Sequence, residues 1–191
     1  MDYKIYQSSI ISKHHNSFLK NCYEAKKLIQ TKFNTNDTTW CYDRYNFLSL
    51  TSSSVLFYKM YKELNHNTRE FIGDDRPLWI QSWLNYHIDD NHLQNSLGYK
   101  KGFHGHQSCY HGYISIDPQN TITKFRNGLE IENKIGQIYI GPGNKGKKLE
   151  NNSWDHYVDI ITPSPSPRIT IAFDIITTQN VVNHHYFIPL L

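Results

Sequence analysis

The chain has 191 residues, of which 38% are hydrophobic and 14% aromatic, and its formal net charge is +3. This length suits one well-buried domain rather than two, and so small a net charge argues against a nucleic-acid partner. Three unpatterned cysteines, Cys22, Cys41 and Cys109, predict no disulfide framework and fit a reducing cytoplasm.

The first third of the chain is predicted to be mainly helical. Residues 3–11 suit a short strand, and apolar residues then recur at helical spacing over residues 16–33, which predicts an amphipathic helix. A second helix is predicted over residues 52–72, where Gly73 would end it. No apolar stretch approaches the length of a membrane span, so we expect no membrane segment and no export by a standard signal.

The character of the sequence changes from about residue 77. Short β-branched and aromatic runs, separated by clusters of Gly, Pro, Asn and Asp, predict strands over residues 78–88, 111–117, 121–125, 136–141, 156–161 and 168–177. Such a series predicts a mostly β fold with helical support (α+β), an antiparallel sandwich or barrel. We divide the single domain into a helical support (1–75), a β core (76–178) and a C-terminal tail (179–191).

Three histidines, His104, His106 and His111, lie within eight residues just before or at the start of a predicted strand. Because alternate side chains of a strand share a face, His104 and His106 could reach one ion. Imidazole suits iron, copper, nickel and zinc. The alternative is that they are surface or core residues, since the chain has 11 histidines and a single H-x-H pair is weak evidence.

A second group of candidates lies downstream, where His156 begins one predicted strand and Arg168 and Thr170 begin the next. A buried arginine is costly without an anionic partner. Its planar fork suits a carboxylate, and a hydroxyl two residues along the same face can share that anion. The alternation places Ile169 on the opposite face but does not say which face is the interior, and an arginine facing solvent is the alternative.

The order of these motifs resembles the Fe(II)/2-oxoglutarate-dependent oxygenases. The pattern comprises H-x-H at 104–106, Gly-Gln-Ile-Tyr-Ile-Gly-Pro-Gly at 136–143, a histidine at 156 and Arg-x-Thr at 168–170. It is most similar to small phage and bacterial members, and it covers about half of the chain. The resemblance implies a double-stranded β-helix, also called a jelly roll and shared with cupins, preceded by the N-terminal helices.

The resemblance also implies roles for individual residues. His104 and His156 match two ligands of the Fe(II) ion, and Arg168 and Thr170 match the anchor of the far carboxylate of 2-oxoglutarate. Tyr113, on the strand after the first motif, would assist this co-substrate. The implied reaction is hydroxylation of a substrate that the sequence does not identify, a small molecule or a protein side chain.

The pattern departs from the family at position 106, where the family has Asp or Glu and this chain has His106. Three interpretations are open. His104, His106 and His156 could form a three-histidine iron site; His106 could leave its position open to another ligand; or His111 could replace one of the pair. We favour the first, with His104, His106 and His156 as the metal ligands and His111 outside the set.

A second resemblance concerns cupins, whose signature opens as Gly98-x5-His104-x-His106 does. The glutamate that cupins place a few residues later is absent, and cupins do not require Arg-x-Thr, so Arg168 favours 2-oxoglutarate. The nucleic-acid demethylase branch of the oxygenases is disfavoured, because it has a second arginine where this chain has Asp174.

Two other functions stay open at this point: a cupin-type metal dioxygenase that needs no 2-oxoglutarate, and a non-catalytic jelly-roll structural or binding protein, such as a virion component. We expect a cytoplasmic protein, in the host cytoplasm if it is viral. The helical first third and the loop at 89–101 are the expected sources of substrate contacts.

Overall fold

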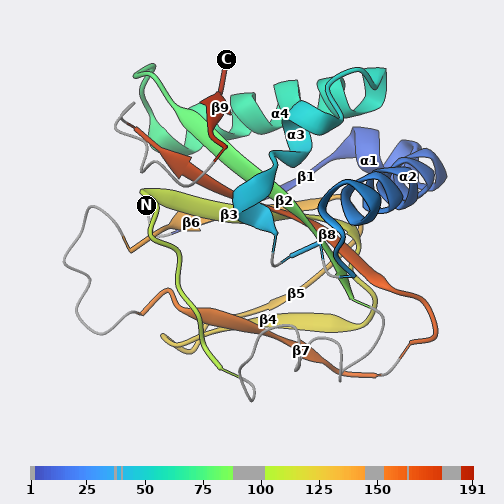
Figure 1. Ribbon diagram of the computed structural model, residues 1–191. Helices are drawn as coiled ribbons and strands as arrows, with labels where there is room; N and C mark the ends of the chain where they lie inside the picture. The colour runs from blue at the N-terminus through green and yellow to red at the C-terminus, as the bar shows by residue number, and fades with distance from the viewer. Residues whose placement is uncertain are drawn as a thin grey trace.

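The computed structural model describes residues 3–36, 38–39, 41–87, 102–144, 153–162, 164–177 and 186–191. The expected substrate loop at 89–101 therefore lies outside the described residues. Two antiparallel sheets face each other, and the helices cover the outer face of the larger one (Figure 1). No described helix combines the length and apolar character that crossing a membrane requires.

The elements follow in chain order. They are β1 (Lys4–Gln7), α1 (Ser9–Lys13), α2 (His15–Phe33), η1 (Tyr42–Arg44), α3 (Phe47–Leu50), α4 (Val55–Ile72), β2 (Trp79–His87), β3 (Tyr110–Asp117), β4 (Thr121–Phe125), β5 (Glu130–Glu132), β6 (Gln137–Pro142), β7 (His156–Ile160), β8 (Arg168–Ile176) and β9 (Ile188–Pro189). The strand orders are β1-β6-β3-β8-β2-β9 in the larger sheet and β5-β4-β7 in the smaller. This arrangement confirms the predicted mostly β, jelly-roll fold with helical support.

The N-terminal region differs from its prediction in one respect. The expected strand at 3–11 stops at Gln7, because the hydroxyl of Ser8 accepts a hydrogen bond from the backbone N–H of Ile11 (3.2 Å) and starts helix α1. The two long helices are confirmed. Helix α4 ends as predicted at Gly73, which adopts φ 78°, the left-handed conformation that glycine takes most easily.

The larger core lies between the helices and the outer face of the six-stranded sheet. One face of α2 and one of α4 bury residues such as Phe18 and Met60 against Ile80 of β2, Ile114 of β3 and Ile171 of β8. The apolar residues of β8 that alternate with Arg168 and Thr170 belong to this core. The face that carries Arg168 therefore turns the other way, toward the smaller sheet.

The second core fills the space between the sheets. Tyr113 of β3 and Tyr139 of β6 pack with Phe125 of β4, Ile131 of β5 and Trp154. Cross-strand partners of an antiparallel sheet point to the same side, and β3 residues 111, 113 and 115 pair with β8 residues 174, 172 and 170. The structure thus resolves what the alternation left open: Arg168, Thr170 and Asp174 all face the interior.

Candidate metal centre

A short backbone bridge places two of the predicted metal ligands side by side. The backbone N–H of His104 donates to the carbonyl of His156 (3.0 Å), and that of His156 donates back (2.9 Å). His156 opens strand β7, so this single pair extends the smaller sheet by one residue of the H-x-H segment. The two imidazole rings lie 4.6 Å apart between centroids.

His104, His106 and His156 form one cluster of possible ligands. Each offers one ring nitrogen, and these three atoms lie within 4.8 Å of one another. Burial lowers the pKa of His104 to about 4 and lowers that of His156 well below its usual value. Both rings are therefore neutral at pH 7, which is the form that binds a metal. The buried Nδ1 of His104 has no hydrogen-bond partner among the described residues.

His111 lies against this cluster from strand β3. Its ring stacks on His106 at 4.6 Å and on His156 at 5.0 Å between centroids. Both ring nitrogens are buried, and within the described residues neither makes a hydrogen bond of ordinary geometry, although the Pro142 carbonyl is nearby. Burial lowers the pKa of His111 far below its usual value. A fourth neutral imidazole thus adjoins the three candidate ligands.

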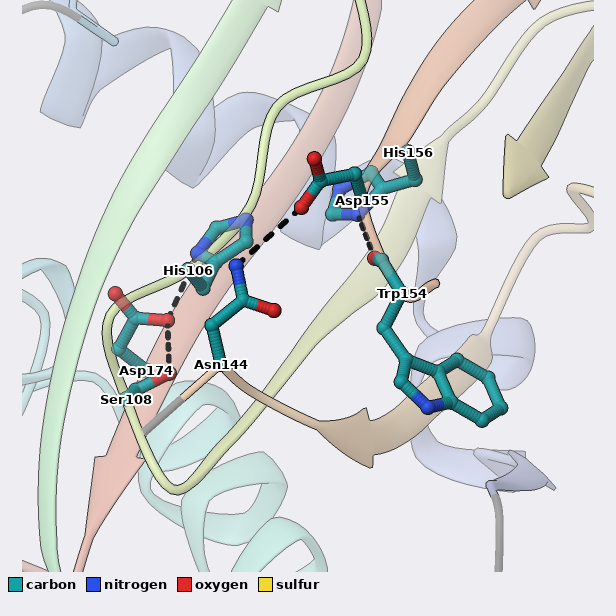
Figure 2. Close-up of polar contacts among 7 residues, drawn as sticks. All are labelled: His106, Ser108, Asn144, Trp154, Asp155, His156 and Asp174. Carbon is teal, nitrogen blue, oxygen red and sulfur yellow. Dashed lines mark hydrogen bonds and ion pairs between the residues drawn. The ribbon is translucent and has the colours of Figure 1, made fainter. Parts of the chain in front are cut away.

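Asp174 is the site residue that sequence reasoning missed. The Nδ1 of His106 lies 2.8 Å from Asp174 Oδ1, and the Ser108 hydroxyl donates to the same oxygen at 2.9 Å (Figure 2). Burial alone would raise the pKa of this carboxyl, but the neighbouring His106 holds it below its usual value. The available signal was the alternation of β8, which places Asp174 on the face of Arg168 and Thr170.

The residue between the first two histidines, Gly105, lies close to two polar side chains. A Cβ atom on Gly105 would lie 2.2 Å from both Asn144 Nδ2 and Asp155 Oδ1. Those two side chains are hydrogen-bonded to each other at 3.3 Å (Figure 2), and the backbone N–H of Asn144 donates to the carbonyl of His106 (2.8 Å). Backbone hydrogen bonds therefore hold the H-x-H segment against Asn144 and His156, and this fixes the backbone from which both imidazoles project.

Arg168 is the clearest sign of an anionic ligand. Its side chain is only 5% exposed, its Nε has no partner among the described residues, and its Nη1 donates to Nδ1 of His87 at 3.4 Å. No carboxylate of the described residues pairs with it, and burial lowers its pKa to about 10. The guanidinium remains charged at pH 7. A buried cation without an anion is costly, so the site calls for one.

The other two predicted co-substrate residues lie on the same interior face. The side-chain amide of Asn85 in β2 donates to the Thr170 hydroxyl at 3.3 Å, and the Thr39 hydroxyl donates to the side-chain oxygen Oδ1 of Asn85 at 3.0 Å. The buried hydroxyl of Tyr113 makes no hydrogen bond of ordinary geometry with a described residue, and burial raises its pKa to about 12. The Tyr113 hydroxyl therefore stays protonated at pH 7 and can donate a hydrogen bond to a ligand oxygen.

These donors fit a divalent iron ion and 2-oxoglutarate. Three clustered imidazoles suit iron, and a buried guanidinium on the same face as two hydroxyl groups suits the carboxylate of a dicarboxylic acid. His104, His106 and His156 would hold the metal, and Arg168, Thr170 and Tyr113 would hold the co-substrate.

The buried histidines predict an acid-sensitive metal-free protein. Below about pH 6.5 the unfolded chain protonates its histidines, while His111 and His156 stay neutral in the folded state because burial depresses their pKa values. The free energy of unfolding should therefore fall as the pH drops below 6.5, by up to about 1.4 kcal/mol per pH unit for each histidine. Urea unfolding with chelator at pH 7.5, 6.5 and 5.5 measures this, and His111→Phe should flatten the profile. A wild-type profile that is already flat would contradict it.

The chain is similar to known proteins in structure but not in sequence. No protein-family model matches the chain, and no curated protein does. Among solved structures, a viral collagen prolyl hydroxylase from Paramecium bursaria Chlorella virus-1 superimposes with a TM-score of 0.58 at 10% identity, over 94% of this chain and 91% of that one.

Two further structures are more distant. A full-length protein from Neurospora crassa, in complex with alpha-KG, has a TM-score of 0.43 at 11% identity, over 69% of this chain and 53% of that one. A protein from Caulobacter crescentus described as of the 2OG-Fe(II) oxygenase family has a TM-score of 0.38 at 17% identity, over 70% and 54%. The chain shares its fold with the viral prolyl hydroxylase over nearly its whole length.

Proposed function

We propose that the protein is a non-haem iron oxygenase that uses 2-oxoglutarate and O2 to hydroxylate a small molecule or a protein side chain. The observation that carries the proposal is Arg168, a buried cation without a carboxylate partner among the described residues. It lies on the interior face of the sheet that also bears Asp174, the partner of His106. The cluster supplies three candidate metal ligands, with His106 in the place of the usual carboxylate, and Arg168 supplies a candidate anion site.

The chain's own residues bind and orient. His104, His106 and His156 would hold the metal, and Arg168 with Thr170 would hold the far carboxylate of the co-substrate. When bound, iron and 2-oxoglutarate supply the oxidation: one oxygen atom of O2 enters the substrate C–H bond, and the other enters succinate as CO2 leaves.

Aromatic rings enclose the cluster. Trp83 stacks against His106 with 5.8 Å between ring centroids, and Phe125 lies 5.3 Å from His156. Tyr42 in turn packs against Trp83 at 5.5 Å. Such a lining covers part of the cluster with apolar surface, which would limit side reactions with water.

The proposal is tested with purified protein loaded anaerobically with Fe(II). On exposure to O2, it should convert 2-oxoglutarate slowly to succinate even without a primary substrate, since the co-substrate site needs no other partner. Succinate is measured by mass spectrometry, and a chelator-treated sample is the control. Absence of both succinate and 2-oxoglutarate binding would contradict the proposal.

A cupin-type dioxygenase that needs no 2-oxoglutarate is the second candidate, and His111 is the observation that favours it. As a fourth imidazole beside the cluster, it could complete a four-nitrogen site in place of a co-substrate. The same assay separates the two functions: oxygen uptake on a substrate with 2-oxoglutarate omitted would support the second candidate.

A further inference from the structure

We infer that Asp174 is a positioning residue of the metal centre, which holds His106 by its Nδ1 proton and places a negative charge directly behind that ligand. This inference deepens the proposed function and rests on the three-histidine metal site. It gives the site a carboxylate that acts through an imidazole rather than on the metal.

The hydrogen-bond pattern fixes the role of each atom. Asp174 Oδ1 accepts from the Ser108 hydroxyl at 2.9 Å and lies 2.8 Å from His106 Nδ1. An ionised carboxylate only accepts, so the proton of the short contact belongs to Nδ1 of His106. The lone pair of the neutral ring is then on Nε2, which is free to bind a metal. A carboxylate behind a metal-bound histidine raises the basicity of that ligand.

Asp174 would influence a bound metal through the imidazole ring of His106 rather than by direct contact with the metal. Its carboxylate bonds the Nδ1 edge of His106, so the imidazole stands between Asp174 and any metal on Nε2 (Figure 2). The ring also packs near-parallel to three others: the angles between the planes are 19° for Trp83, 9° for His111 and 3° for His156. The hydrogen bond to Asp174 and these ring contacts together orient His106.

The contacts of Asp174 lead to His106 alone among the ionisable groups of the described residues. Its ion-pair contact there is with His106, at 2.8 Å, and its own side chain is 19% exposed. Asp174 can therefore influence a metal on this site through the His106 ring.

The first test is the tautomer of His106 in the wild-type, metal-free protein, read from long-range 15N–1H NMR correlations at pH 7.5. The inference predicts the proton on Nδ1. A proton on Nε2 would overturn it without any need for a variant.

The second test is the affinity for Co(II), titrated by absorption without 2-oxoglutarate or O2. Asp174→Asn keeps the shape but can donate to Nδ1, so the Nε2–H tautomer should replace the Nδ1–H form and Co(II) affinity should fall about 10- to 100-fold. Ser108→Ala is the matched control, because it removes the other hydrogen bond to the same oxygen, and its affinity should stay within about threefold. Equal losses in both variants, or no Co(II) binding by the wild type, would overturn the inference.

A double variant adds a result that a merely structural role would not produce. His106→Ala removes the proposed ligand, so it should weaken Co(II) binding strongly by itself. Adding Asp174→Asn to His106→Ala should cause little further loss of Co(II) affinity, because Asp174 acts through the ring that is no longer there. A further loss of about 10-fold or more in a folded double variant would count against the inference. The Co(II) titrations contain no 2-oxoglutarate, so they test this inference alone. If only the proposed function is wrong, the wild type will bind Co(II) in these titrations but form no succinate in the separate Fe(II) assay.

Discussion

Arg168→Met is expected to abolish 2-oxoglutarate binding and, at the same time, to raise the melting temperature of the ligand-free protein. The guanidinium is buried and has no carboxylate partner among the described residues, so it destabilises the empty protein. Removing one partner of a buried charge pair costs about 2–5 kcal/mol, which corresponds to a loss of co-substrate affinity of about 30-fold or more. The melting temperature should rise by about 2 °C or more.

Two measurements on the metal-loaded protein check this prediction: calorimetric titration of 2-oxoglutarate under anaerobic conditions, and thermal unfolding without ligand. Thr170→Val is the matched control on the same face of β8 and should weaken the co-substrate less, since it removes one neutral hydrogen bond. Arg168→Lys keeps the positive charge but loses the planar guanidinium that binds a carboxylate with two hydrogen bonds. Its affinity for 2-oxoglutarate should therefore lie between those of Arg168→Met and Thr170→Val. A variant that loses stability and keeps its affinity would make Arg168 a structural residue.

His156→Ala is expected to eliminate high-affinity metal binding. The ring lies at the centre of the cluster, in contact with His104, His106 and His111. The loss should exceed the 10- to 100-fold that removing a group behind a ligand produces, so more than about 100-fold. Succinate formation should disappear with the metal.

Metal content after anaerobic loading with Fe(II), determined by elemental analysis, measures this effect. His66→Ala is the control, because His66 is exposed on α4 and far from the cluster in the fold. Arg168→Met should retain the metal, so the two variants separate metal binding from co-substrate binding. Full metal occupancy in His156→Ala would contradict the assignment of this residue as a ligand.

The fold was predictable because its signals are local. The period of β8 alternates apolar residues with Arg168, Thr170 and Asp174, and the periods of α2 and α4 define one buried face each. The elements missed by the prediction are short. The helices α1, η1 and α3 have five, three and four residues. The strands β5 and β9 have three and two residues, and their strand character comes from pairing with β4 and β2 rather than from composition.

The site was predictable only in part, because its contacts join distant segments. The alternation of β8 was visible, but which face is interior depends on the helices that cover the other one. The contact of His106 with Asp174 spans 68 residues and depends on the register between β3 and β8. In the sequence, Asp174 was only a position that lacked an arginine. In the structure it is the carboxylate bonded to the histidine that stands where a carboxylate was expected.

An anaerobic crystal structure with Fe(II) and 2-oxoglutarate tests the metal centre and the co-substrate site together. We expect one metal ion bound by His104, His106 and His156, with the far carboxylate of 2-oxoglutarate on the guanidinium of Arg168 and Asp174 still bonded to Nδ1 of His106. A metal bound elsewhere, or 2-oxoglutarate absent from Arg168 in a metal-loaded crystal, would contradict this expectation.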